Sequence, residues 1–103
     1  MSWIRAASLA ELPSGSAIEL FAGDHNIAIC RIGEDVHALD GVCPHRGGPL
    51  AQGAIHGNML VCPWHAWEFD CTTGTNDFNP EIQQAKFAVL IVGDDILVQI
   101  PDA

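Results

Sequence analysis

The stretch CPHRGGPL at positions 43–50 resembles a second stretch, CPWHAWEFD at 62–70. Each begins with Cys-Pro and contains a histidine one or two residues later. Proline stiffens the backbone directly after each cysteine, at Pro44 and Pro63. The glycine pair 47–48 in the first stretch permits backbone shapes that other residues resist. The two stretches therefore predict two similar, tight loops.

The potential ligands form the pattern Cys43-x-His45, sixteen residues, then Cys62-x2-His65. Two thiolates and two imidazoles from separate loops suit zinc or iron–sulfur chemistry. Common zinc modules group like ligands, cysteine with cysteine and histidine with histidine, whereas each loop here carries one of each. The mixed order favours two metal atoms held side by side by two similar loops.

Outside these loops, turn signals recur about every ten residues, and short runs rich in Ile, Val, Leu, Trp and Phe lie between them. This spacing predicts an all-β fold, an antiparallel β-sandwich or barrel. The clearest hairpin pairs 86–92 with 96–100 through Gly93-Asp94-Asp95. No long segment keeps a helical period, and 8–12 predicts at most one helical turn.

Length and charge limit what the protein can be. The 103 residues predict a single domain over 1–103. The net charge of −9 would repel nucleic acid and anionic membranes, so a basic partner protein is the better fit. Apolar runs are far shorter than the roughly 20 residues of a membrane helix, and the N-terminus lacks the apolar core of a signal peptide. We therefore expect a soluble protein in the cytoplasm, where cysteines bind metal more often than they form disulfides.

Together these features resemble the Rieske 2Fe-2S family, whose pattern is C-x-H, fifteen to seventeen residues, C-x2-H. The stretch 53–75 also resembles the family's strand, loop, strand and Thr-Gly turn. The resemblance implies a Rieske-like fold with a small cluster-binding subdomain over about 42–70, formed by the two loops. It implies one 2Fe-2S cluster with four ligands, the cysteines on one iron and the histidines on the other: Cys43, His45, Cys62 and His65.

The chain departs from the Rieske proteins of respiratory and photosynthetic complexes. Those proteins brace the cluster with a disulfide between the loops, and the corresponding positions here are Gly48 and Trp64. They also donate two hydroxyl hydrogen bonds to cluster sulfur, from positions that read Trp67 and Phe69 here. Fewer such bonds lower the potential, so we expect the low end of the Rieske range, about −150 mV.

The resemblance implies an electron carrier and not an enzyme, because 103 residues have no room for the mononuclear-iron domain of an oxygenase. It is strongest to ferredoxins of bacterial aromatic-ring-hydroxylating dioxygenases, which serve aromatic hydrocarbon catabolism. Such a carrier takes electrons from an NAD(P)H-dependent flavoprotein reductase, passes them to a terminal Rieske non-haem iron oxygenase, and is expected to be a monomer. Two alternatives stay open: a Rieske-type small subunit of an assimilatory nitrite reductase, and a zinc-stabilised, non-redox binding module.

The other cysteines and histidines receive no function from the sequence. Cys30 and Cys71 have no histidine nearby and are interpreted as small core or turn residues. His25, His37 and His56 lie beside turn or strand signals and are interpreted as ordinary surface or half-buried residues.

Overall fold

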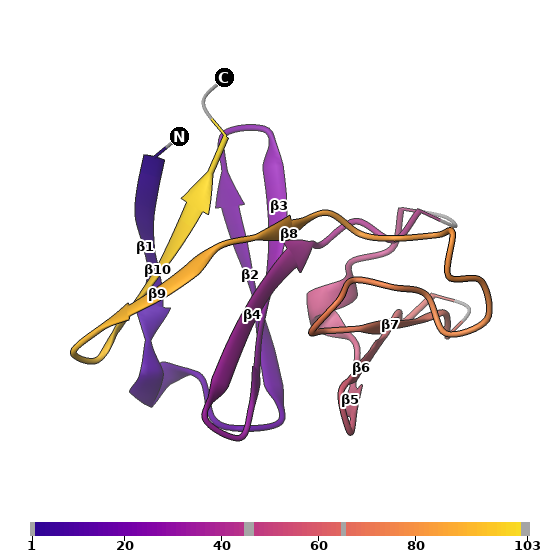
Figure 1. Cartoon of the computed structure of the whole chain (residues 1–103), viewed down its shortest axis with the longest axis horizontal. Coiled ribbons are helices and arrows are strands. Elements are labelled where there is room, and N and C mark those ends of the chain that lie inside the picture. The colour runs from indigo at the N-terminus through magenta and orange to yellow at the C-terminus, as the bar shows by residue number, and fades with distance from the viewer. Residues whose placement is uncertain (1, 45–46, 65, 102–103) are drawn as a thin grey trace.

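The computed structural model describes residues 2–44, 47–64 and 66–101. In this part of the chain, three antiparallel sheets lie beside one another, so the all-β prediction is confirmed (Figure 1). The first sheet has the order β1 (Ser2–Ser8), β10 (Asp95–Ile100), β9 (Val89–Val92). The second has the order β2 (Ser16–Ala22), β3 (His25–Ile32), β4 (Asp35–Asp40), β8 (Lys86–Phe87). The third has the order β5 (Ile55–His56), β6 (Met59–Val61), β7 (Glu68–Asp70).

The middle sheet buries both of its faces, because its strand β3 carries an apolar run without alternation. Ile27 and Ile29 point to one side and pack in a core with residues of β10. Ala28 and Cys30 point to the other side and pack in a second core with residues of the third sheet and its loops. The third sheet and its loops therefore pack against one face of the middle sheet.

The predicted strand over 86–92 is two strands that belong to different sheets. Lys86 pairs with Leu39 in the middle sheet, while Val92 pairs with Asp95 in the first sheet. Between them Ala88 carries no strand pairing, and Figure 1 shows the chain passing from one sheet to the other at this point. The hairpin through 93–95 is confirmed, but it begins three residues later than the sequence pattern indicated.

Strand β1 was not expected from the sequence. It pairs along its length with β10, at the opposite end of the chain. Its residues are mostly exposed or half-buried, and Ala7 is its one buried residue. A strand with so little buried apolar surface has no clear two-residue alternation, and only its distant partner defines it.

Helical structure in the described residues is limited to two short 3-10 turns, η1 (Leu9–Glu11) and η2 (Leu50–Gln52). The first agrees with the prediction of at most one turn near 8–12, and the second was not predicted. No helix of the described residues has the length and apolarity needed to cross a membrane.

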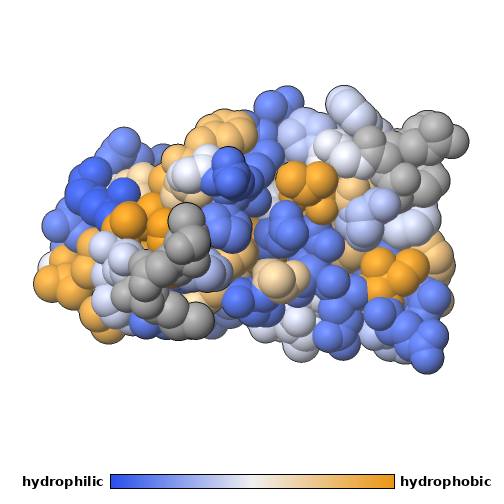
Figure 2. Space-filling model, turned by 90° about the horizontal axis from the view of Figure 1, so that it is seen from above, coloured by the Kyte–Doolittle hydropathy of each residue, from blue (hydrophilic) through white to orange (hydrophobic). Residues whose placement is uncertain are grey.

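One face of the molecule is covered largely by hydrophilic residues (Figure 2). In that view hydrophobic residues appear at the end formed by the β9–β10 hairpin and in separate patches nearer the opposite end. The exposed large side chains there include Leu90, Ile91 and Val92. The opposite end of the molecule carries the two cysteine loops (Figure 1).

Candidate metal centre

The first cysteine loop is closed by two backbone hydrogen bonds. The amide of Cys43 donates to the carbonyl of Gly48 at 2.9 Å, and the amide of Gly47 donates back to the carbonyl of Cys43 at 2.7 Å. Gly47 takes the left-handed backbone conformation, with φ of 75°. Glycine adopts this conformation without steric cost, so the sequence suits the turn.

The second loop repeats the first, bond for bond. The amide of Cys62 donates to the carbonyl of Trp67 at 2.7 Å, and the amide of Ala66 donates to the carbonyl of Cys62 at 3.1 Å. Ala66 stands where Gly47 stands in the first loop and has φ of 59°, the one positive value of a non-glycine residue in the described chain. The two Cys-Pro stretches are therefore one turn built twice, as their similarity predicted.

The two loops bring the thiols of Cys43 and Cys62 together. Each cysteine is only 1% exposed. Burial, followed by a hydrogen bond with the Cys43 thiol, raises the pKa of Cys62, while a bond from the Trp64 amide opposes the rise. A metal cation would remove the penalty on two buried thiolates, because it supplies the positive charge that the pocket lacks. The donor chemistry of this pair therefore fits a metal or an iron–sulfur cluster.

Gly48 allows the two loops to approach each other. A Cβ at this position would lie 2.8 Å from the Cys62 sulfur and 3.1 Å from two ring atoms of Trp64. Gly48 and Trp64 are the positions that the family resemblance paired across the loops, and the structure places them against each other. Neither carries a sulfur atom, and all four cysteines of the chain are free of disulfides.

The predicted ligands His45 and His65 lie outside the described residues. The structure therefore brings together two of the four predicted ligands, Cys43 and Cys62. The assignment of the two histidines stays a prediction.

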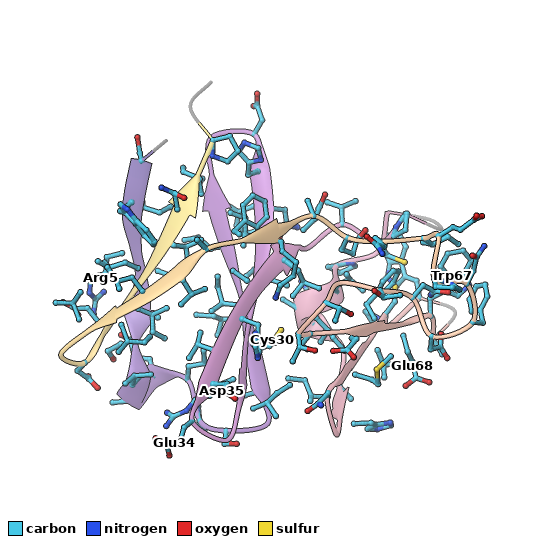
Figure 3. The ribbon with its side chains drawn as sticks, viewed as in Figure 1. Arg5, Cys30, Glu34, Asp35, Trp67 and Glu68 are labelled. Carbon is cyan, nitrogen blue, oxygen red and sulfur yellow. The ribbon has the colours of Figure 1, made fainter. Side chains whose placement is uncertain are left out.

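Aromatic rings fill the space around the thiols. Phe69 is fully buried in the same core as Cys43 and Cys62, and Trp67 packs against that core. The Trp67 ring also meets the ring of Phe78 edge-on, with 4.9 Å between centroids, and lies in Figure 3 at the loop end of the molecule. Neither Trp67 nor Phe69 has a hydroxyl group to donate to a cluster.

A third loop, residues 76–84, is attached to the other two by buried amide side chains. Asn76 donates from Nδ2 to the carbonyl of Glu68 at 3.2 Å. Gln84 donates from Nε2 to the carbonyl of Asp40 at 2.9 Å and to that of Val42 at 2.6 Å. These carbonyls belong to the three residues that precede Cys43, so Gln84 holds the base of the first loop. Its sequence, one glutamine of a pair, gave no signal of this role.

The cysteines and histidines outside the motif are placed much as the sequence indicated. Cys30 and Cys71 are fully buried, but they also contact each other through their thiols, which was not predicted. His25 is half-buried with its ring edge-on to Phe87, and His56 is exposed.

A small all-β scaffold that buries two neighbouring thiols in matched loops fits the class of proteins with a thiolate-bound metal centre. Comparison with known families makes the class specific. The family model of the Rieske [2Fe-2S] domain matches residues 2–97, and the chain belongs to this family.

The most similar proteins include carriers of dioxygenase systems. The ferredoxin component of the naphthalene 1,2-dioxygenase system of Pseudomonas aeruginosa is 27% identical over 99 residues, which cover 95% of each chain. The ferredoxin of carbazole 1,9a-dioxygenase from Nocardioides aromaticivorans has a TM-score of 0.87 and 26% identity, with 95% of this chain and 97% of that chain covered. The Rieske-like fold and the resemblance to dioxygenase ferredoxins are thereby confirmed.

A protein of a different system shares the fold. The putative NADH-dependent nitrite reductase small subunit of Mycobacterium tuberculosis has a TM-score of 0.87 at 20% identity, with 98% of this chain and 97% of that chain covered. This identity is low enough that the likeness concerns the fold alone.

Proposed function

We propose that this protein is a low-potential, one-electron carrier that works in the cytoplasm as a ferredoxin of an aromatic-ring-hydroxylating dioxygenase system. Its donor would be an NAD(P)H-dependent flavoprotein reductase and its acceptor a terminal Rieske non-haem iron oxygenase. The observation that carries the proposal is the pair of buried thiols held by two matched loops. The ferredoxins named above support the choice of system, since each matches nearly its whole length.

The proposed ligands are Cys43, His45, Cys62 and His65. When bound, a 2Fe-2S cluster with this mixed ligation supplies one-electron redox chemistry at a potential above that of all-cysteine clusters. The chain's own residues hold the two thiolates and keep water away from them. Phe69 fills the core beneath the thiols, and Gly48 lets one loop close on the other.

The surroundings of the thiols support a potential at the low end of the Rieske range. Hydrogen bonds to cluster sulfur stabilise the more negative, reduced state and so raise the potential. The chain contains no tyrosine, and its four serines all precede position 17, far from both loops in the sequence. Trp67 and Phe69 stand where other Rieske proteins have hydroxyl donors, so we expect about −150 mV.

The distribution of charge supports a basic surface on the partner. Arg5 is bonded to Asp95, and Arg31 donates to the carbonyls of Leu9 and Leu12. Lys86, the one lysine of the chain, donates to another carbonyl in the same way. The described cations are thus engaged within the chain, and most carboxylates are left for partners. Their field would speed the encounter with a basic partner.

Exposed apolar side chains support docking at the loop end. Val42, Trp64 and Phe78 come from the three loops around the thiols and are 43%, 50% and 59% exposed. Transient electron-transfer contacts are small, so three such side chains within an acidic surface are enough to centre one. We propose that reductase and oxygenase use this same end in turn.

The test begins with anaerobic reduction and EPR. Mixed His/Cys ligation gives a spectrum distinct from that of all-cysteine ligation, and His45→Ala or His65→Ala should lose it while Cys30→Ala retains it. Zinc without iron or acid-labile sulfide would overturn the proposal in favour of a structural metal. The second step compares electron delivery to a terminal oxygenase with delivery to a nitrite reductase catalytic subunit. The shared fold keeps the nitrite reductase role as the second candidate, and delivery to that subunit alone would establish it.

A further inference from the structure

A second pair of cysteines, Cys30 and Cys71, lies away from the metal-centre motif in the sequence. Strand register places Cys30 on the face of the middle sheet that packs against the third sheet, together with Ala28 and Leu39. Cys71 follows the last strand of the third sheet and packs in the same core, between the third sheet and the middle sheet. Figure 3 shows Cys30 at the boundary between the two sheets. The pair therefore bridges two parts of the fold that are joined otherwise by packing and a few hydrogen bonds.

The two thiols are in contact and fully shielded from solvent. Both residues have 0% exposure and lie in the same buried core, and their thiols are close enough to shift each other's pKa. The interaction between the two thiols, followed by burial, raises the pKa of Cys30, and the same interaction lowers the pKa of Cys71. The ammonium of Lys86 donates to the Cys71 carbonyl at 2.5 Å and also favours a thiolate nearby.

No group of three or more metal-binding side chains gathers anywhere in the described part of the chain. The pair thus lacks, among these residues, the third ligand that a metal site would need. Two adjacent, buried thiols beside the ammonium of Lys86 are instead the arrangement of a dithiol that can be oxidised to a disulfide.

We propose that Cys30 and Cys71 form a reversible disulfide that fastens the third sheet and its cysteine loops to the middle sheet. The oxidant is hydrogen peroxide, which is small enough to enter when the exposed turn after Cys71 opens. The Cys71 thiolate attacks one peroxide oxygen, the O–O bond breaks, and a sulfenic acid and one water form. The Cys30 sulfur then displaces the sulfenic oxygen as a second water. Two thiols lose two electrons and two protons in all, and a dithiol reductant restores them.

The disulfide would enclose both cysteine loops. The 42 residues from Cys30 to Cys71 contain all four predicted cluster ligands and the strands β4, β5, β6 and β7. Cross-linking a loop of this length restricts the unfolded chain and raises stability. The oxidised protein would therefore hold its two loops in place under the conditions that damage iron–sulfur clusters. The Cys30–Cys71 pair is separate from the proposed cluster ligands, and its oxidation needs no partner protein.

The test treats the cluster-containing protein with a few equivalents of hydrogen peroxide, blocks free thiols with iodoacetamide, and maps peptides after digestion with trypsin and a glutamate-specific protease. Cleavage at Arg31, Glu19, Glu68 and Glu81 places the two cysteines on peptides 20–31 and 69–81. We expect these peptides to be joined, with a mass two hydrogen atoms below their sum, and to separate on treatment with dithiothreitol. The visible absorption of the cluster should persist through the peroxide treatment, before the protein is unfolded for thiol blocking and digestion.

Thermal unfolding gives a second readout. The oxidised wild-type protein should unfold about 10 °C above its reduced form, and Cys30→Ala and Cys71→Ala should each abolish this difference. Alkylation of both cysteines after peroxide treatment would overturn the proposal. So would a cross-link that appears only between peptides 35–46 and 47–68 as the visible absorption disappears, since that would be oxidation of the vacated cluster ligands. Peptide mapping of the wild-type protein decides the matter even where a variant does not fold.

Discussion

Replacement of Ala66 by glycine should stabilise the protein. Ala66 occupies the left-handed region with φ of 59°, in a turn whose other copy has glycine at the equivalent position. The left-handed conformation costs a non-glycine residue roughly 1–2 kcal/mol. Glycine also has more conformational freedom in the unfolded chain, and this offsets about 0.4–1 kcal/mol of the stabilisation. We therefore expect Ala66→Gly to add about 0.5–1 kcal/mol to the free energy of unfolding, or about 4 °C in Tm.

Gly47→Ala is the matched control, because it makes the opposite change in the other loop. A Cβ at Gly47 would meet nothing within 4 Å, so its cost is one of backbone conformation alone. The variant should lose about as much stability as Ala66→Gly gains. Both are followed by circular dichroism on heating, with the visible absorption recorded in parallel to report cluster retention. A lower Tm for Ala66→Gly, or an unchanged Tm for Gly47→Ala, would refute the equivalence of the two turns.

Three further changes test other parts of the structure. Gln84→Leu should leave two part-buried carbonyls at the base of the first loop without their side-chain donor and lower the Tm by about 5 °C, whereas Gln83→Leu, on an exposed neighbour, should change it little. Burial, followed by the charge of Lys86, lowers the pKa of His37 in the folded protein. The stability that neutral His37 contributes is therefore complete above the unfolded-state pKa of about 6.5, and it is lost as pH falls through the lower pKa of the folded state. Urea titrations should accordingly show a weaker acid loss for His37→Gln than for the exposed-site control His56→Gln, and equal slopes would contradict this. Electron transfer from the reductase should slow as ionic strength rises, because the charge of −9 is screened; a rate independent of salt would exclude steering by this surface.

The fold was predictable as far as its signals were local. Turn residues and short apolar runs gave the all-β class and the hairpin into β10, and the mixed Cys/His order indicated the family. Strand β1 was not predicted, because it is defined by its pairing with β10, which lies at the other end of the chain. The division of 86–92 into two strands at Ala88 was also not predicted, because the chain can pass from one sheet to another without a break in its apolar run.

The site was predictable in its donors but not in its supports. Repetition of Cys-Pro identified Cys43 and Cys62, and the structure places them together. Gln84 was missed because an amide that pairs with backbone carbonyls has no sequence pattern of its own. The contact of Cys30 with Cys71 was missed because it depends on how two sheets pack, which spacing along the chain does not encode.

The hydrogen bonds that the cationic side chains make within the protein limit which reagents can modify it. Lys86 is the only side-chain amine, and its ammonium is committed to the Cys71 carbonyl. Amine-reactive cross-linkers will therefore capture its complexes poorly, and a reaction that succeeds at Lys86 will also loosen a tie between two sheets. Reagents that activate carboxylates have many more targets on this surface. They are the better choice for mapping which proteins it touches, or for attaching it to an electrode.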